Sequence, residues 1–191
     1  MNFLAHLYLS GDSKDIMIGN FIADGIKGKD HIVYREGIKE GIALHRKIDE
    51  FTDHHPVVSL SKDRLRPKYA KYSSVIVDIF YDHYLACNWQ KYSPTPLKEY
   101  ASNVYQLMNN NLEMMPPLVL KFLPYMISGN WLFNYSNFEG IENVLKGMSR
   151  RAKFVSHMEE SIHDLKNDYQ LYEKEFFTFF PELIKYVEGM R

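Results

Sequence analysis

Hydrophobic residues recur at intervals of three and four along most of this chain, whereas stretches that alternate hydrophobic and polar residues are scarce. The first spacing places hydrophobic side chains on one face of an α-helix, and strict alternation is the pattern of a half-buried strand. The sequence therefore predicts an all-α protein, a bundle of helices. Its 191 residues can bury a sizeable core and no linker divides them, so we predict one domain over residues 1–191.

Prolines set several of the predicted helix ends, because proline lacks a backbone N–H and restricts the residue before it. Pro56 should end one helix, Pro67 should open the next long helix, and Pro181 should bend or restart the last one. The pattern predicts helices over residues 2–9, 14–28, 34–54, 57–65, 68–90, 97–112, 117–129, 138–151 and 155–180.

The composition narrows the function classes. A net charge of −1 argues against a general binder of polyanions, so we expect no nucleic-acid partner. The single cysteine, Cys87, excludes an internal disulfide and a cysteine-rich metal site, and it suits a reducing compartment. We find no secretory leader, and the longest uncharged run, 122–138, is too short and too interrupted to span a membrane. We therefore expect a cytoplasmic protein with no membrane partner.

Ionisable residues interrupt two segments that otherwise read as helices. In GIALHRKIDEFTD, His45, Asp49 and Asp53 are four residues apart and form one polar stripe, and in VIVDIFYDHYL, Asp78 and Asp82 are one turn apart among hydrophobic residues. Charged groups on such faces are costly unless they are paired, protonated or bound to a cation. A divalent metal ion would offset that cost for all of them together. The alternatives are a solvated stripe with one salt bridge, and aspartates paired with lysine or arginine.

Three further residues are weaker candidates for the same site. His6 interrupts a hydrophobic run, where a histidine is more often a hydrogen-bonded core residue than a ligand. Asn20 and Asp24 are one turn apart on another hydrophobic helix, and Asp24 is the better ligand. Oxygen and imidazole ligands without thiolate indicate manganese, iron, magnesium or zinc, and several carboxylates favour manganese or magnesium. This set of residues favours metal-assisted hydrolysis of a phosphoester.

Six segments carry a resemblance to a known family: MNFLAHLYLS, GNFIADGIKG, GIALHRKIDEFTDHHP, VDIFYDHYLACNW, SGNWL and FFTFFPEL. In order and spacing they resemble acyl carrier protein phosphodiesterases, also called holo-acyl-carrier-protein hydrolases, over nearly the full length. Proteins of this family are similar to an unorthodox branch of the HD phosphohydrolases. The resemblance implies an all-helical, HD-like fold and removal of 4′-phosphopantetheine from the serine of holo-acyl carrier protein, with Mn²⁺, or Mg²⁺ or Fe²⁺, as cofactor.

The resemblance also implies roles for single residues. The usual HD signature has histidine directly before aspartate, whereas here Asp82 precedes His83. We expect Asp82, His83 and Arg46 to act in catalysis, with His83 as proton donor or phosphate contact and Arg46 or Lys47 stabilising negative charge. The expected metal ligands are His6, Asp24, His45, Asp49, Asp78 and Asp82.

A basic segment, SKDRLRPKYAK, suggests a docking surface for the acidic carrier protein. The residues expected to dock it are Lys47, Lys62, Arg64, Arg66 and Lys68, followed by Lys71. The alternative is a solvated loop. The aromatic and Met-rich stretch 100–138 is either core or the wall of a pantetheine groove. Two other functions stay open: a phosphohydrolase of nucleotides or other small phosphate esters, and a helical binding module without metal.

Overall fold

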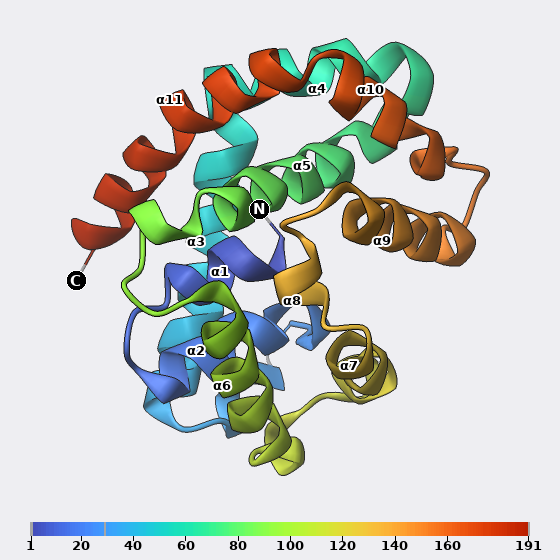
Figure 1. Ribbon diagram of the computed structural model, residues 1–191. Coiled ribbons are helices and arrows are strands. Elements are labelled where there is room, and N and C mark those ends of the chain that lie inside the picture. The colour runs from blue at the N-terminus through green and yellow to red at the C-terminus, as the bar shows by residue number, and fades with distance from the viewer. Residues whose placement is uncertain (1, 29, 191) are drawn as a thin grey trace.

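The structure is a computed structural model and describes residues 2–28 and 30–190. All secondary-structure elements in those ranges are helices (Figure 1). No strand occurs in those ranges, so the predicted all-α class is confirmed. The α-helices are α1 (Phe3–Tyr8), α2 (Lys14–Ile22), α3 (Glu36–His54), α4 (Pro56–Tyr69), α5 (Ser73–Cys87), α6 (Leu97–Asn109), α7 (Pro117–Ser128), α8 (Trp131–Asn134), α9 (Phe138–Arg151), α10 (Ser161–Asn167) and α11 (Tyr169–Glu188). The 3₁₀ turns are η1 (Ala23–Gly25), η2 (Asp30–Val33), η3 (Ala70–Tyr72), η4 (Trp89–Lys91), η5 (Leu112–Met114) and η6 (Met158–Glu160).

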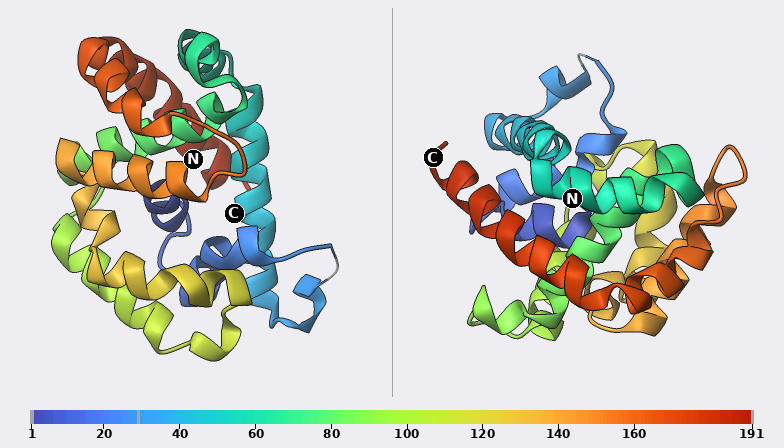
Figure 2. Two further views of the ribbon diagram at one scale, coloured as in Figure 1. Left: turned by 90° about the vertical axis from the view of Figure 1, so that its right-hand side faces the viewer. Right: turned by 90° about the horizontal axis from the view of Figure 1, so that it is seen from above.

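Helix α5 runs through the middle of the molecule. It contacts α1, α4, α9 and α11, and α11 lies alongside α4 at the top of the view in Figure 1. Helices α6, α7 and α8 lie below it, and α3 crosses behind α1 (Figures 1 and 2). From Ile76 to Ala86, all residues of α5 except Asp78 are buried, which explains why this segment is hydrophobic on nearly every face.

Most predicted helix boundaries are confirmed, but two of the prolines expected to set helix ends lie inside helices. The predicted helix 155–180 is also wrong, because η6, α10 and α11 occupy that region. Pro56 is the first residue of α4, and α9 covers the predicted 138–151. Pro67, which was expected to open a helix, lies in the last turn of α4, and α5 begins only at Ser73. Pro181 lies inside α11, which neither stops nor restarts there. Both proline rings are exposed, so each costs a backbone hydrogen bond without disturbing a buried contact.

Two glycines bring α2 and α3 close together. A Cβ atom on Gly19 would collide with the carbonyl oxygen of Ile38, and one on Gly41 would collide with that of Ile16. The helices can therefore cross at this distance only because both positions lack a side chain. This crossing sets α2 directly against the face of α3 that carries His45.

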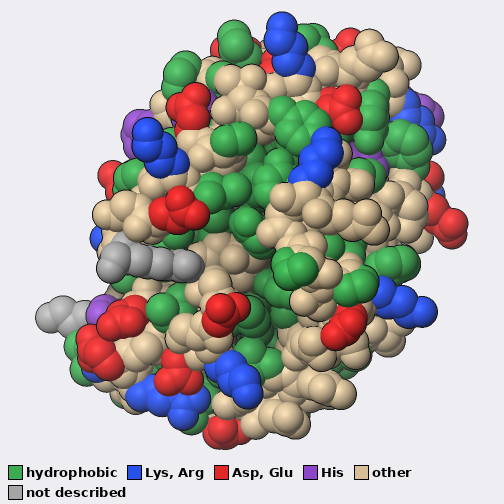
Figure 3. All heavy atoms as spheres, turned by 60° about the vertical axis from the view of Figure 1, so that its left-hand side comes forward, with side chains coloured by type: hydrophobic (Ala, Val, Ile, Leu, Met, Phe, Trp, Pro, Cys, Tyr) green, Lys and Arg blue, Asp and Glu red, His purple; other side chains and the backbone are tan. Residues whose placement is uncertain are grey.

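The surface seen in Figure 3 gathers hydrophobic side chains in a central band. Acidic and basic side chains are interspersed around that band, so neither sign of charge dominates this face (Figure 3). None of the helices within the described ranges combines the length and the hydropathy needed to cross a bilayer.

Candidate active site

A groove with a volume of about 520 Å³ collects four of the five aspartates that the sequence analysis singled out. The residues that line it come from α1, η1, α3, η3, α5 and α9 and their flanks. Four of them are aspartates: Asp24, Asp49, Asp53 and Asp78. Asp49 and Asp53 lie one turn apart on α3, as their spacing predicted, and Asp78 is supplied by α5.

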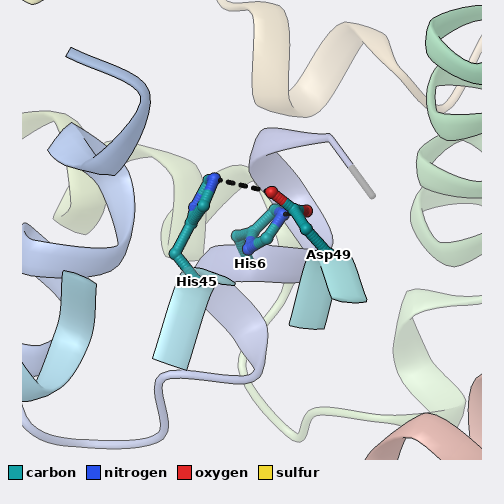
Figure 4. A group of neighbouring side chains, drawn as sticks. All are labelled: His6, His45 and Asp49. Carbon is teal, nitrogen blue, oxygen red and sulfur yellow. Dashed lines mark hydrogen bonds and ion pairs between the residues drawn. The ribbon is translucent and has the colours of Figure 1, made fainter. Parts of the chain in front are cut away.

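At this groove, two imidazole rings meet one carboxylate (Figure 4). His6 Nε2 lies 3.1 Å from Asp49 Oδ1, and His45 Nε2 lies 3.1 Å from Asp49 Oδ2. His45 Nε2 is also 3.3 Å from a carboxylate oxygen of Asp24. The two rings stack with their centroids 4.0 Å apart. One ligand atom from each of His6, His45 and Asp49 lies within 4.8 Å of the others, so the three could hold one metal ion.

Asn20, which is fully buried on α2, holds both rings in place. Its side-chain oxygen accepts hydrogen bonds from the Nδ1–H groups of His6 (2.9 Å) and His45 (3.0 Å). Its amide nitrogen donates to the carbonyl of His6 and to the hydroxyl of Ser10, which fixes the orientation of the amide. The backbone carbonyl of Asn20 also accepts from His45 Nδ1–H at 2.9 Å.

These hydrogen bonds decide the tautomers of the two histidines. Because Asn20 offers only oxygen atoms to the two Nδ1 atoms, each Nδ1 carries a proton, and the neutral ring has its lone pair on Nε2. Both Nε2 atoms face carboxylate oxygens. A lone pair opposite a carboxylate is repulsive unless a cation lies between them, either a proton or a metal ion.

The pKa values of the cluster reflect that need for a cation. Burial, followed by the charge of His45, lowers the pKa of His6 to about 4. Burial alone would also lower the pKa of His45, but the carboxylates of Asp24 and Asp49 outweigh it and raise the pKa to about 9. Burial would raise the pKa of Asp49, yet the hydrogen bond from protonated His45 is the largest of the contributions that hold it well below its usual range. In the metal-free protein, the proton on His45 therefore supplies the positive charge between the carboxylates. A bound divalent ion would take its place.

The residues present therefore fit a divalent cation. Two imidazole nitrogens of defined tautomer converge with the carboxylates of Asp24 and Asp49, and no thiolate is among them. Histidine and carboxylate ligands suit manganese, iron and zinc. The hydrogen bonds that both histidines donate to Asn20 provide the outer support that ligating histidines need.

The structure does not bring Asp82 into this cluster. Asp82 is fully buried, and its carboxylate accepts hydrogen bonds from the backbone N–H groups of Leu4 (2.7 Å) and Ala5 (3.1 Å) at the start of α1. Burial raises the pKa of Asp82 to about 7, although these N–H groups oppose the shift. The cost of burying Asp82 is thus offset by a helix N-terminus, and we leave it out of the proposed ligand set.

His83 also lies outside the groove lining. Its Nδ1–H donates to the carbonyl of Tyr135 at 2.7 Å, its Nε2 lies 3.2 Å from the hydroxyl of Tyr169, and its ring stacks on Phe138. Arg46 is exposed on α3 and does not line the groove, and Lys47 lines a separate surface pocket. The structure therefore gives none of these three residues a contact with the histidine cluster.

The predicted docking segment is helical, and its charges are paired within the molecule. Lys62 binds Asp53, Arg64 binds Glu175, Arg66 binds Asp63 and Lys68 binds Asp164. These ion pairs, two of them with acidic residues distant in sequence, reduce the positive charge that the segment presents, and the docking role of its residues stays a prediction. Lys71, by contrast, lines the groove and lies over the ring of Phe154, and no described acidic residue pairs with it.

The helical fold and the convergence of His6, His45 and Asp49 thus define an all-α protein with a candidate metal centre. Comparison with known proteins is more specific. A family model described as acyl carrier protein phosphodiesterase matches residues 1–183. The chain is 32% identical over 185 residues to the acyl carrier protein phosphodiesterase of Enterobacter sp. (strain 638), covering 96% of both chains. It is 31% identical over 190 residues to that of Photorhabdus laumondii, covering 99% of this chain and 96% of the relative.

This chain therefore belongs to the acyl carrier protein phosphodiesterase family, as the sequence motifs predicted. No solved structure matches it. The likeness of its helices to the HD phosphohydrolase fold accordingly stays a prediction.

Proposed function

We propose that this protein is a metal-dependent phosphodiesterase that hydrolyses holo-acyl carrier protein to the apo-protein and 4′-phosphopantetheine. Family membership supports the reaction and the substrate. The observation that carries the metal dependence is the convergence of His6 Nε2 and His45 Nε2 on the carboxylates of Asp49 and Asp24.

In the proposed reaction, an oxygen of water bonds to phosphorus, the bond between phosphorus and the serine oxygen breaks, and a proton goes to that serine oxygen. A divalent cation, when bound, would neutralise phosphoryl charge and lower the pKa of water. We assign His6, Asp24, His45 and Asp49 as ligands, with Asp78 as a further ligand from α5. Among candidate ions we favour manganese, because the set mixes imidazole with several carboxylates.

Asn20 acts as a positioning residue in this proposal. It keeps the proton of each imidazole on Nδ1, so that both Nε2 atoms are available to the ion. Lys71 supplies positive charge in the groove wall, where the phosphate of the substrate would lie.

We further propose that the acidic carrier protein docks beside the groove, on the basic residues near Lys71. Arg150 and Arg151 end α9, and Lys153 lies two residues beyond it; all three are exposed and have no ion pair with a described acidic residue. The side chains of Lys71 and Lys153 both lie over the ring of Phe154. Opposite charges at the rim of an interface mainly raise the association rate. A cytoplasmic location, where such a substrate is made, stays a prediction.

The test is incubation of holo-acyl carrier protein with metal-free protein, before and after addition of Mn²⁺, followed by mass spectrometry of the carrier protein. We expect loss of the prosthetic group only with the metal. The variant Asp49→Asn should lose at least about a hundredfold in turnover, because it removes the carboxylate that faces both histidines. Asp53→Asn is the matched control, since Asp53 lies one turn further along α3 and binds Lys62 instead.

Four outcomes would contradict the proposal. Turnover that is unaffected by removal of divalent ions would exclude the metal dependence. Equal turnover in the Asp49 and Asp53 variants would exclude the ligand set. Hydrolysis of nucleotides or small phosphate esters without hydrolysis of the holo-protein would favour a phosphohydrolase of small substrates. The absence of any turnover would favour a helical binding module.

A further inference from the structure

A second cavity, with a volume of about 150 Å³, adjoins the metal-site groove. The two share four lining residues, namely Asn2, Phe3, Asp24 and Met148. Asp24 is one of the proposed ligands, so one end of this cavity lies at the metal site. The rest of its wall comes from α2, α7, α8 and α9 and their flanks.

The cavity is almost entirely hydrophobic, and its wall is braced by aromatic contacts. Phe122 packs against Phe3 and Phe21 with centroids 5.4 Å and 6.0 Å away, and its ring stacks on Trp131. Protein cores rarely leave such a space unfilled, because an empty hydrophobic cavity loses packing energy. A preformed hydrophobic cavity that opens beside a polar site is the usual form of a small-molecule subsite.

One polar group in the wall lacks a partner. Tyr135 is fully buried and lines this cavity, and within the described part of the chain its hydroxyl makes no hydrogen bond. Arg151 also lines the cavity and is exposed. A buried hydroxyl without a hydrogen bond costs free energy, which a ligand with an amide group could restore.

We propose that this cavity binds the pantetheine arm of the substrate. This inference rests on the proposed function. The arm is uncharged, carries a pair of methyl groups and a hydroxyl near its phosphate end, and contains two amide groups further along. With the phosphate at the metal site, the methyl groups would pack against Phe3 and Met148, and an amide would reach the hydroxyl of Tyr135.

A nucleoside fits the same wall less well. A base and a ribose, like the arm, present polar groups that each need a partner, and the polar side chains of this lining are limited to Asn2, Asp24, Tyr135 and Arg151. The arm also offers a pair of methyl groups to the hydrophobic wall, which a nucleoside lacks. The predominance of hydrophobic side chains therefore favours the arm. A nucleotide or another small phosphate ester is an outcome that the experiment distinguishes.

The experiment compares two substrates of the Mn²⁺-loaded protein: holo-acyl carrier protein, and bis(4-nitrophenyl) phosphate, a phosphodiester without the arm. The variants are Tyr135→Phe, which removes the hydroxyl, and Val144→Phe, which fills the cavity from α9. Tyr100→Phe is the matched control, because the hydroxyl of Tyr100 is also buried without a partner but lines a different pocket.

For each variant we measure the ratio of kcat/KM for the holo-protein to kcat/KM for bis(4-nitrophenyl) phosphate. We expect Tyr135→Phe to lower this ratio about tenfold, the value of one hydrogen bond of about 1.4 kcal/mol, through a higher KM. Val144→Phe should lower it further, and Tyr100→Phe should leave it unchanged. Free pantetheine should compete with the holo-protein in the parent protein and compete more weakly with Val144→Phe.

Unchanged ratios in both cavity variants would overturn the inference while leaving the proposed function intact. A fall of equal size in Tyr100→Phe would also overturn it, since the effect would then come from general loosening of the core. If the parent protein hydrolyses bis(4-nitrophenyl) phosphate and not the holo-protein, the proposed function itself has failed, and the cavity proposal with it.

Discussion

Replacement of Asn20 by alanine tests whether this residue sets the tautomers of the two histidines. The side chain of Asn20 makes four hydrogen bonds: it accepts from His6 and His45, and it donates to the carbonyl of His6 and the hydroxyl of Ser10. At about 0.5–1.5 kcal/mol for each, the variant should lose about 2–6 kcal/mol of unfolding free energy.

The two rings should respond differently to this substitution. His45 Nδ1–H retains the backbone carbonyl of residue 20 as an acceptor, whereas His6 Nδ1–H has no second acceptor among the described residues. His6 can then change tautomer or rotate away from Asp49. We expect the affinity for Mn²⁺ to fall by about 10- to 100-fold, the usual effect of removing a group that orients a ligand.

The assay is calorimetric titration of metal-free protein with Mn²⁺, at a temperature where circular dichroism shows every variant to be folded. Ser10→Ala is the control. It removes the hydroxyl that donates to the carbonyl of His6 and accepts from Asn20, but it leaves the bonds from both Nδ1–H groups intact. It should lower stability with little change in metal affinity. The reasoning is refuted if Asn20→Ala binds Mn²⁺ as tightly as the parent, or if Ser10→Ala weakens binding equally.

Four further predictions follow from the surroundings of three charged groups. Because neighbouring carboxylates outweigh burial and raise the pKa of His45 to about 9, Mn²⁺ must displace a proton from it, and apparent affinity should rise about tenfold per pH unit up to that value in calorimetric titrations. In the metal-free protein, the stability that this proton contributes should be complete below pH 6.5 and lost as the pH rises through about 9, as thermal unfolding would show. Asp82→Asn should reduce the unfolding free energy by about 1–3 kcal/mol yet retain Mn²⁺ binding, because Asp82 holds the start of α1; abolished binding in a folded variant would return it to the ligand set. Arg64→Met should cost roughly 3 kcal/mol of stability by leaving Glu175 unpaired, while KM for the holo-protein stays the same; a raised KM would restore the docking role.

The helices could be predicted because the local signals agree. The hydrophobic spacing of 138–151 coincides with α9, and Pro56 begins α4. Pro67 and Pro181 were misjudged because an exposed proline near the end of α4, or on the outer side of α11, costs less than ending a helix whose other residues are buried. Burial of the neighbouring turns is a tertiary property, which the local pattern does not contain.

The site was predictable in part. The spacing of His45 and Asp49 put both on one face of α3, and a polar Asn20 in the hydrophobic segment IMIGNFIADGI was a signal whose meaning only the crossing of α2 and α3 reveals. For Asp82, the sequence correctly indicated that burial needs compensation. The compensating groups are backbone N–H groups of residues 4 and 5, 78 and 77 positions away, and no spacing rule connects them.

The acidic partners of the basic segment could not be predicted for the same reason. Lys62, Arg64 and Lys68 appear unpaired along the chain, because only Asp63 lies among them. Two of these three residues find their acidic partners, Glu175 and Asp164, about a hundred positions further on. Once those pairs form, the positive charge left beside the groove is that of Lys71 and the end of α9.

The most direct test of the central claim, that His6, Asp24, His45 and Asp49 share one divalent ion, is anomalous X-ray diffraction at the manganese edge from crystals grown with Mn²⁺. The account predicts a strong peak within coordination distance of both Nε2 atoms and of Asp49, with both Nδ1 atoms still bonded to Asn20. A peak at the carboxylate of Asp82, or no peak at this cluster in protein that hydrolyses the holo-carrier, would contradict it.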